Sequence, residues 1–271
     1  MAKKRSVSSG ASIKSKKLNK KLLVFLIVLA IVALAVFLYA AQSRNIEEAD
    51  IHLQQGKLFF ENNETVHAIE ELEKAVKLDP KNDEAYNHLA LAHYANNEFY
   101  KSVKSYKNSI GINPNNAETH RRLGFSYYRI KEFKNAIAEF KSALELNPSD
   151  YLSYNGMGLS YHGLANYNNA IDAYEQSLLI STNDTSVYGY LGAAYFKLRD
   201  WNNSIKYYTI AVETNPGDYA ALNDLGASYG NSGNYEKSLE YNKMALQANP
   251  NYQKARRNER ILESWERNRQ P

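Results

Sequence analysis

Residues 117–150 read AETHRRLGFSYYRIKEFKNAIAEFKSALELNPSD, and variants of this stretch follow one another every 34 residues from about residue 49 to residue 252. A fixed period of this length is typical of stacked supersecondary units, none of which can bury its apolar face alone. We therefore expect the function to lie in a surface rather than in a catalytic pocket. Proline marks the period, with one threonine in its place: Pro80, Pro114, Pro148, Thr182, Pro216 and Pro250.

Small and large side chains alternate in a fixed order within each unit when the proline is counted as position 32. Position 8 is Gly or Ala, and positions 20 and 27 are Ala or Ser. Positions 11, 17 and 24 are mostly aromatic, which accounts for most of the 22 tyrosines. Rings at these places can fill a core whose helices approach closely where the side chains are small.

The apolar spacing within a unit is helical, with two runs of about 14 residues joined by a short turn. In the fourth unit these runs are roughly residues 151–164 and 168–181. Each proline ends a second helix, because it cannot donate the next backbone hydrogen bond. Position 34 is expected to cap the helix that follows. It holds Asn116, Asp150, Asp184 and Asp218.

The combination of small-8, aromatic-11, small-20, aromatic-24, small-27 and Pro-32 resembles the tetratricopeptide repeat. The resemblance implies an all-α fold, a right-handed α-solenoid of helix-turn-helix repeats, followed by a C-terminal capping helix over residues 253–271. That helix is expected to pack through Ala255, Ile261, Leu262 and Trp265. The six repeats would be residues 49–82, 83–116, 117–150, 151–184, 185–218 and 219–252.

Residues 22–41 are apolar throughout and contain no charge, Gly or Pro. A helix of this length spans roughly 30 Å, the thickness of the hydrocarbon core of a bilayer. We expect a single transmembrane helix over residues 22–42. A cleaved signal peptide is the alternative, but its apolar stretch is normally shorter. In addition, Leu38 or Tyr39 stands where a small residue would precede the cleavage site.

The first 21 residues carry eight Lys or Arg and no acidic residue, which predicts a basic disordered tail. The positive-inside rule places this tail in the cytoplasm and the repeats across the membrane. A bacterial inner membrane with the repeats in the periplasm is favoured. Two continuations stay open: the membrane helix runs directly into the first repeat, or the chain restarts a helix at Asn45, with Glu48 completing a capping box.

Composition argues against several classes of function. Without its tail the chain has 25 basic residues (33 minus 8) against 29 acidic ones, so overall basicity gives no reason to expect nucleic-acid binding. The absence of cysteine excludes thiol nucleophiles and thiolate metal sites. His52, His93 and His120 occupy repeat core positions, and no P-loop is present. We expect no enzymatic activity, cofactor or metal.

In the tetratricopeptide family, positions 2, 5, 9, 12 and 13 of the first helices face the concave side. The resemblance therefore implies a groove with an aromatic and aliphatic stripe beside amides and one arginine. Rings can anchor an extended peptide or a helix, and amides can satisfy its backbone. The alternative is that the rings pack mainly against neighbouring helices. The candidate groove residues are Phe60, Tyr94, Tyr128, His162, Phe196, Asn87, Arg121, Asn155, Asn223, Leu91, Phe125 and Leu159.

These features predict a membrane-anchored scaffold that binds protein or peptide partners and supports an envelope or secretion assembly. One alternative is a cytosol-facing receptor of the mitochondrial import type. Another is a non-catalytic accessory subunit of a glycosyltransferase or cell-wall enzyme. No unit has Lys at position 5 together with Asn at position 9, so we do not expect the clamp that captures chaperone carboxylate tails. The membrane helix has no small-xxx-small pattern to indicate dimerisation.

Overall fold

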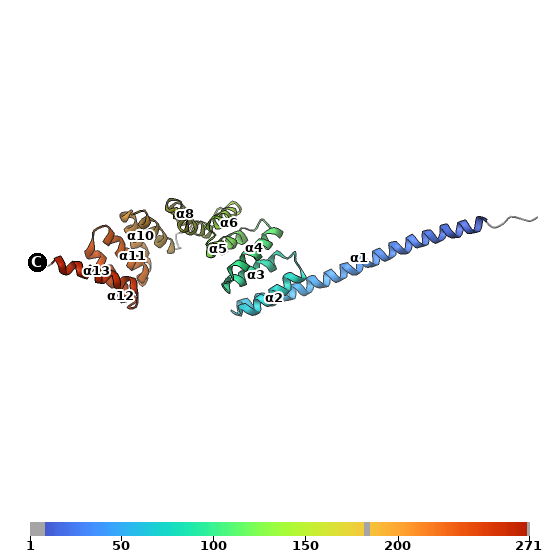
Figure 1. Ribbon diagram of the computed structural model, residues 1–271, viewed down its shortest axis with the longest axis horizontal. Coiled ribbons are helices and arrows are strands. Elements are labelled where there is room, and N and C mark those ends of the chain that lie inside the picture. Colours follow the sequence, from blue (N-terminus) through green and yellow to red (C-terminus); the bar gives the residue numbers. More distant parts are fainter. Residues whose placement is uncertain (1–8, 182–184, 270–271) are drawn as a thin grey trace, which may run out of the picture. The chain divides into compact units, whose positions relative to one another are not determined.

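The computed structural model describes residues 9–181 and 185–269, and every regular element in these ranges is a helix (Figure 1). This all-helical architecture of successive helix pairs confirms the predicted fold class. The helices are α1 (Ser9–Glu61), α2 (Thr65–Leu78), α3 (Asp83–Ala95), α4 (Phe99–Ile112), α5 (Ala117–Arg129), α6 (Phe133–Leu146), α7 (Tyr151–Gly163), α8 (Tyr167–Ile180), α9 (Ser186–Lys197), α10 (Trp201–Thr214), α11 (Tyr219–Asn231), α12 (Tyr235–Ala248) and α13 (Gln253–Arg269).

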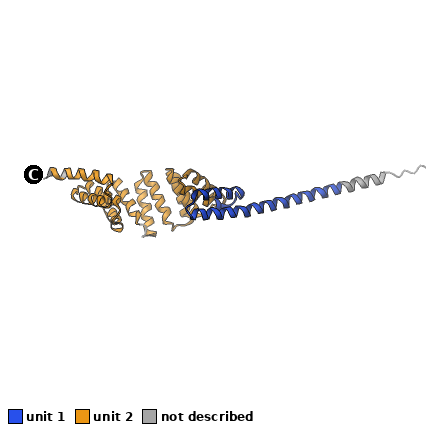
Figure 2. Ribbon diagram, turned by 90° about the horizontal axis from the view of Figure 1, so that it is seen from below, with its two compact units in different colours: residues 1–85 blue, residues 86–271 orange. Residues whose placement is uncertain are grey.

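The chain divides into two compact units, one ending at Ala85 and the other beginning at Tyr86 (Figure 2). In the first unit, α1 is one uninterrupted helix of 53 residues, or about 80 Å at 1.5 Å per residue. The apolar segment and the first repeat helix are therefore continuous, and no helix restarts at Asn45. The helix also includes residues 9–21, where the sequence predicts a disordered tail; residues 1–8 lie outside the described part of the chain.

Two different environments follow each other along α1. Leu22 to Tyr39 are exposed, with nothing in their unit to cover them, and this part of the helix is long and apolar enough to cross a membrane. Further along, Ala49 and Leu53 are buried, and α1 packs against α2, which contributes the buried Leu72. The one helix therefore joins an uncovered apolar segment to a packed repeat.

The turn inside each repeat has the same backbone geometry. In repeat 3 the Lys131 N–H bonds to the Tyr128 carbonyl at 3.0 Å, and the Glu132 N–H bonds to the Tyr127 carbonyl at 2.9 Å. The second bond closes the first helix in a Schellman-type end, which places one residue in the left-handed region. That residue is position 15 of every repeat: Asn63, Asn97, Lys131, Ala165, Arg199 and Gly233.

Of the four predicted helix caps at position 34, two are confirmed. The side chains of Asn116 and Asp218 accept from backbone N–H groups of the helices that follow them. Asp150 makes no such bond; its carboxylate accepts from the Ser153 hydroxyl at 2.7 Å and from Arg121 at 3.0 Å. The Asp150 carboxylate therefore accepts from the Ser153 and Arg121 side chains instead of from the free backbone N–H groups of α7. Asp184 lies outside the described residues.

The small positions bring the helices together around buried rings. Phe140 of α6 is fully buried, and a methyl group on Gly156 of α7 would lie 2.2 Å from its Cζ atom. Gly158 is equally close to Tyr174 of α8, at 2.4 Å from Cε1. The two glycines are required because a larger residue would collide with a ring that has no room to move. The Gly156-Met157-Gly158 sequence is thus a packing feature of α7.

First and second helices form different layers in the unit that begins at Tyr86. Helices α5, α7, α9, α11 and α13 each contact the next one in this series. No pair of successive second helices (α6, α8, α10 and α12) does so within the described residues. Contact on one side and separation on the other bend the array, which places the first helices on its concave side.

Helix α13 closes the array by packing against α12 and α11. Ala255 and Leu262 are buried, as the sequence predicts for a capping helix. The expectation for Ile261 is wrong, because its side chain is 57% exposed. Ile261 is six residues from Ala255, which turns it well away from the packing side of a helix with 3.6 residues per turn. The side chain of Trp265 lies outside what the structure describes.

Candidate protein-binding groove

Three of the four predicted groove residues at position 5 bond to the residue that precedes the next first helix or to that helix itself. Asn87 donates to the Thr119 hydroxyl, and Arg121 donates to Asp150 at 3.0 Å. Asn223 accepts from Asn258 of α13 at 3.0 Å. Asn155 is 5% exposed, so it presents little surface to a ligand. This row therefore holds the first helices in register, and its groups are largely engaged within the chain.

The rings at position 12 pack within their own repeats but stay half-exposed. Each lies on the ring at position 17 of the second helix, at centroid distances of 5.1 to 5.8 Å. The alternative prediction, that these rings pack against neighbouring helices, is therefore correct in part. The packing fixes the rings, and they remain half-exposed. The pairs are Tyr94 with Phe99, Tyr128 with Phe133, His162 with Tyr167, and Phe196 with Trp201. Phe60, the remaining member, is half-buried in the other unit.

His162 is a partial exception among the position-12 side chains. Burial lowers the pKa of its imidazole, and the charge of Lys197 lowers it further. Its Nε2 atom is covered and has no hydrogen-bond partner among the described atoms. The ring is therefore neutral near pH 7 and contributes mainly apolar surface to the groove.

Three predicted residues come together around an apolar hollow between repeats 2 and 3. Leu91 and Tyr94 of α3 and Phe125 of α5 line a cavity of about 130 Å³ together with Tyr106 and Arg122. Burial raises the pKa of Tyr106 to about 12, although the charge of the nearby Arg122 acts to lower it, so the Tyr106 hydroxyl stays neutral. The remaining position-9 residue, Leu159, packs half-buried against the core of repeats 4 and 5. We call this cavity the repeat-2/3 hollow; its size suits one aliphatic or aromatic side chain.

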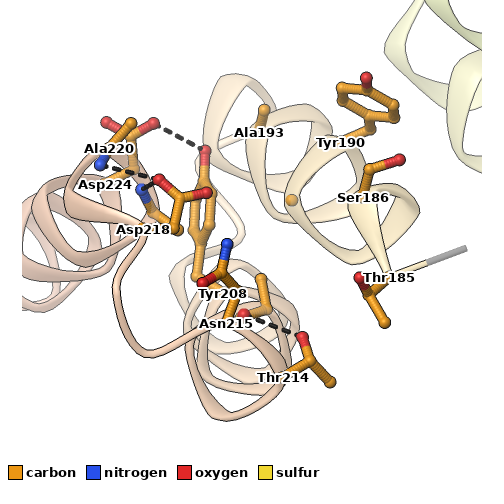
Figure 3. Close-up of a pocket in the computed structure, with 13 residues that line it drawn as sticks. Thr185, Ser186, Tyr190, Ala193, Tyr208, Thr214, Asn215, Asp218, Ala220 and Asp224 are labelled. Atoms are coloured by element: carbon orange, nitrogen blue, oxygen red, sulfur yellow. Dashed lines mark hydrogen bonds between the residues drawn. The ribbon is translucent and has the colours of Figure 1, made fainter.

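A larger hollow of about 430 Å³ lies between repeats 5 and 6, lined by residues of α9, α10 and α11 and the short segments beside them (Figure 3). Ser186 and Tyr190 stand on the α9 side, and Asp218 and Asp224 stand on the other. No Lys, Arg or His is among the residues that line it. We call this cavity the repeat-5/6 hollow. Its full lining is Thr185, Ser186, Gly189, Tyr190, Ala193, Tyr208, Ala211, Thr214, Asn215, Asp218, Ala220, Ala221 and Asp224.

Asp224 is the chemically distinctive group of the repeat-5/6 hollow. Its carboxylate accepts from the Tyr208 hydroxyl at 3.4 Å and from the Asn223 amide at 3.0 Å (Figure 3 shows the first). Burial raises the pKa of Asp224, and Asp218 adds to the rise; the two hydrogen bonds and the charge of Lys254 act in the opposite direction. The hollow therefore has a desolvated carboxylate in its wall.

Sequence reasoning did not find the repeat-5/6 hollow, although a signal for it is present. The groove positions 2, 5 and 9 of repeat 5 are Ser186, Gly189 and Ala193, where other repeats have larger residues such as Arg121 and Phe125. Three small side chains on one helix face remove the filling of the groove at that point. Sequence reasoning looked for large residues in the groove, and it therefore overlooked a cavity that exists because three groove residues are small.

The described part of the chain contains no group of three His, Cys, Asp or Glu side chains that could hold a metal ion. His52 and His120, at repeat core positions, instead pair with Glu71 and Glu139 of their own hairpins, the latter at 2.7 Å. What the groove offers is shape, aromatic surface and one desolvated carboxylate. These properties are suited to binding a partner.

Stacked helix hairpins with an inner groove define the class of helical-repeat proteins. Family models described as "TPR repeat" match residues 56–97 and 92–131, and models described as "Tetratricopeptide repeat" match residues 117–150, 151–184 and 191–253. Together these matches cover well over half of the chain, which therefore belongs to the tetratricopeptide repeat family.

Solved structures of the same architecture extend over most of this chain. PilW, described as a widely conserved type IV pilus biogenesis factor, is 20% identical with a TM-score of 0.68, covering 77% of this chain and 96% of its own. PilF of Pseudomonas aeruginosa is 19% identical with a TM-score of 0.65, covering 79% and 97%. YrrB, described as having an unusual peptide-binding site, is 20% identical with a TM-score of 0.58, covering 68% and 95%. At this level of identity the likeness concerns the fold. No curated protein matches the sequence.

Proposed function

We propose that this protein is a non-catalytic, membrane-anchored scaffold whose repeat array binds an extended segment of a partner protein along its first helices. The observation that carries the proposal is the repeat-2/3 hollow, where Leu91, Tyr94 and Phe125 meet around an open apolar cavity. Side chains held by packing before a ligand arrives lose little entropy on binding. Peptide binding by YrrB and a role of PilW in pilus biogenesis are consistent with this use of the fold.

Anchoring follows from α1 rather than from the repeats. Its apolar segment is exposed and continuous with the first repeat helix, so insertion would hold the first repeat at a fixed distance from the bilayer. The buried Ala49 is eight residues further along the helix than Ala41, the end of the apolar run; this is about 12 Å of helix. We place the repeats outside the cytoplasm, in a bacterial envelope, because the 21 residues before the apolar run carry eight Lys or Arg and no acidic residue.

Photo-crosslinking tests the groove with a matched pair of tyrosines. We expect p-benzoylphenylalanine at Tyr94 to form an adduct with a partner protein in cells, because this ring lines the repeat-2/3 hollow. The same substitution at Tyr100 should give none. Tyr100 belongs to the same repeat but is 74% exposed on the second helix, away from the groove. Mass spectrometry of the adducts is the measurement. Equal adducts at both sites would contradict the groove proposal.

Cysteine labelling tests the orientation against a background without native cysteine. We expect Ser149→Cys, in an exposed loop between repeats, to react with a membrane-impermeant maleimide in intact bacterial cells. Ser105→Cys should react only after denaturation, because position 105 is 6% exposed. If Ser149→Cys reacted only after lysis, the repeats would be cytosolic and the import-type receptor would become the better proposal. An adduct with a glycosyltransferase or cell-wall enzyme in the preceding experiment would favour the accessory-subunit function.

A further inference from the structure

The repeat-5/6 hollow is an opening that helix packing does not require. Gly189 of α9 lies in its wall, and a methyl group added there would meet no atom within 4 Å. Glycine within a helix is less stable than alanine by about 0.5–1 kcal/mol. At Gly156 and Gly158 close contact with a ring explains the absence of a side chain. At Gly189 the only structural consequence of that absence is the space it leaves.

The chemistry of this space is one-sided. Asp224 is in its wall, Asp218 stands beside it, and no basic residue lines it. Asp218 is engaged as a helix cap, since its Oδ1 atom accepts from the N–H groups of Ala220 and Ala221. Each oxygen of Asp224 accepts a single hydrogen bond. A carboxylate has about four acceptor sites, so Asp224 retains capacity for a further donor.

Two tyrosines line the hollow together with the carboxylate. Tyr190 stands across the hollow from Asp224 (Figure 3) and is stacked on Tyr174, with ring centroids 5.5 Å apart, which fixes its orientation. Tyr208 forms another part of the wall. Faces of tyrosine rings attract cations, most strongly where water is excluded. Ring faces and a free acceptor within one cavity are complementary to an elongated side chain that ends in a positive charge.

We propose that the repeat-5/6 hollow receives a lysine or arginine side chain of the partner segment that lies in the groove. This inference rests on the proposed function and adds the chemistry of the partner: an apolar side chain for the repeat-2/3 hollow and a basic one three repeats further along. The same carboxylates oppose an acidic ligand such as a free carboxylate tail. The pairing of a half-buried carboxylate with a partner cation offsets the cost of desolvating Asp224.

The surroundings of Asp224 make its charge a cost to the stability of the folded protein, which suggests that the charge serves binding instead. It is packed near Tyr208 from α10, near Asn223 and Asp218 from its own hairpin, and within reach of Lys254 from α13. Because the pKa of the folded state is raised, the folded protein holds the proton more tightly than the unfolded chain. Stability therefore falls as the pH rises through that range. Asn at this position would avoid the loss, so we expect Asp224→Asn to melt no lower than the natural protein at pH 7.

Peptide selection provides the test. A phage library of random 12-residue peptides is selected on the full chain in nanodiscs and, in parallel, on Asp224→Asn, Gly189→Leu and Gly111→Leu. We expect Lys or Arg to be enriched at one position of the selected peptides, and to lose its enrichment with the first two variants. Gly111→Leu is the matched control, since Gly111 of α4 also has open space for a side chain but lies outside the hollow. Changing the enriched residue to Gln should weaken binding about tenfold or more in the natural protein and hardly at all in Asp224→Asn.

The outcomes separate the inference from the proposed function. Peptides that bind without a basic residue, or whose basic residue is still required after both Asp224→Asn and Gly189→Leu, would overturn the inference and leave groove binding intact. Failure to select any peptide on the natural protein would overturn both. Thermal melts check that the variants fold. Gly189→Leu carries the test independently if Asp224→Asn does not fold, because it blocks the same space without altering the charge.

Discussion

Gly156→Ala should destabilise the repeat array by about 2 kcal/mol, because overpacking of a tight core costs about 1–3 kcal/mol or more and the gain in helix propensity returns only about 1. The added methyl group would lie 2.2 Å from Cζ of Phe140, 2.5 Å from Cε1 and 2.8 Å from Cε2. Phe140 cannot move aside. It is fully buried, its ring also lies against Gly124, and it meets Phe125 edge-on at 5.0 Å.

Thermal unfolding of the full chain in detergent, followed by far-ultraviolet circular dichroism, is the measurement. A loss of 2 kcal/mol corresponds to a fall in Tm of roughly 4–8 °C for an array of this size. Gly189→Ala is the control, and its sign should be opposite. The same exchange in α9 meets open space and should raise stability by about 0.5–1 kcal/mol. Equal effects of the two variants would contradict the packing argument.

A double substitution shows whether the collision with Phe140 is the cause. Leucine at position 140 lacks the Cζ and Cε atoms that the methyl group of Gly156→Ala would strike. Phe140→Leu alone should destabilise, since it leaves a cavity in the core. In its presence Gly156→Ala should cost clearly less than it does alone. Additive effects, within about 0.5 kcal/mol, would mean that the two residues do not interact in this way.

The repeat architecture could be predicted because each unit carries the same local pattern. The order of small and large residues specifies which helices approach closely, as Gly158 and Tyr174 do. The turn geometry could not be predicted in the same way. Asn97 and Gly233 adopt the left-handed backbone readily, but Lys131 and Arg199 do so against their own preference. There the Schellman-type hydrogen bonds impose the conformation.

The groove could be predicted only as far as single repeats determine it. The rings at position 12 pack on partners at position 17 of the same hairpin, so a single repeat determines where they lie. The position-5 side chains were predicted to serve a ligand, but partners such as Thr119 for Asn87 come from the next repeat along the chain. Asp150 was predicted to be a cap, but its carboxylate accepts from Arg121, which lies 29 residues earlier in the same repeat. Contacts between residues this far apart, within a repeat or between two repeats, have no signature in the local sequence.

The apolar part of α1 is continuous and exposed, and its proposed role as an anchor leads to the remaining prediction. Ala30→Arg combined with Val32→Arg should release the protein from membranes into the soluble fraction. An arginine near the centre of a membrane helix costs roughly 2.5–3.5 kcal/mol, so two should cost about 5–7 kcal/mol. No repeat contact would compensate, since the side chains around Val32 are exposed in their unit. Fractionation of cells with a carbonate wash, followed by mass measurement of the intact chain, is the experiment.

The control uses the same exchange further along the same helix. Ile46→Arg with Ile51→Arg should leave the protein in the membrane fraction, because positions 46 and 51 lie beyond the apolar run and are 47% and 53% exposed. Arginine there would stand at or beyond the headgroups, where its charge is solvated. A chain that stays membrane-bound with arginine at 30 and 32 would contradict insertion of this segment. A natural protein that is soluble and shortened near Ala41 would show that the segment is a cleaved signal peptide, and the fixed spacing between repeats and bilayer would then not exist.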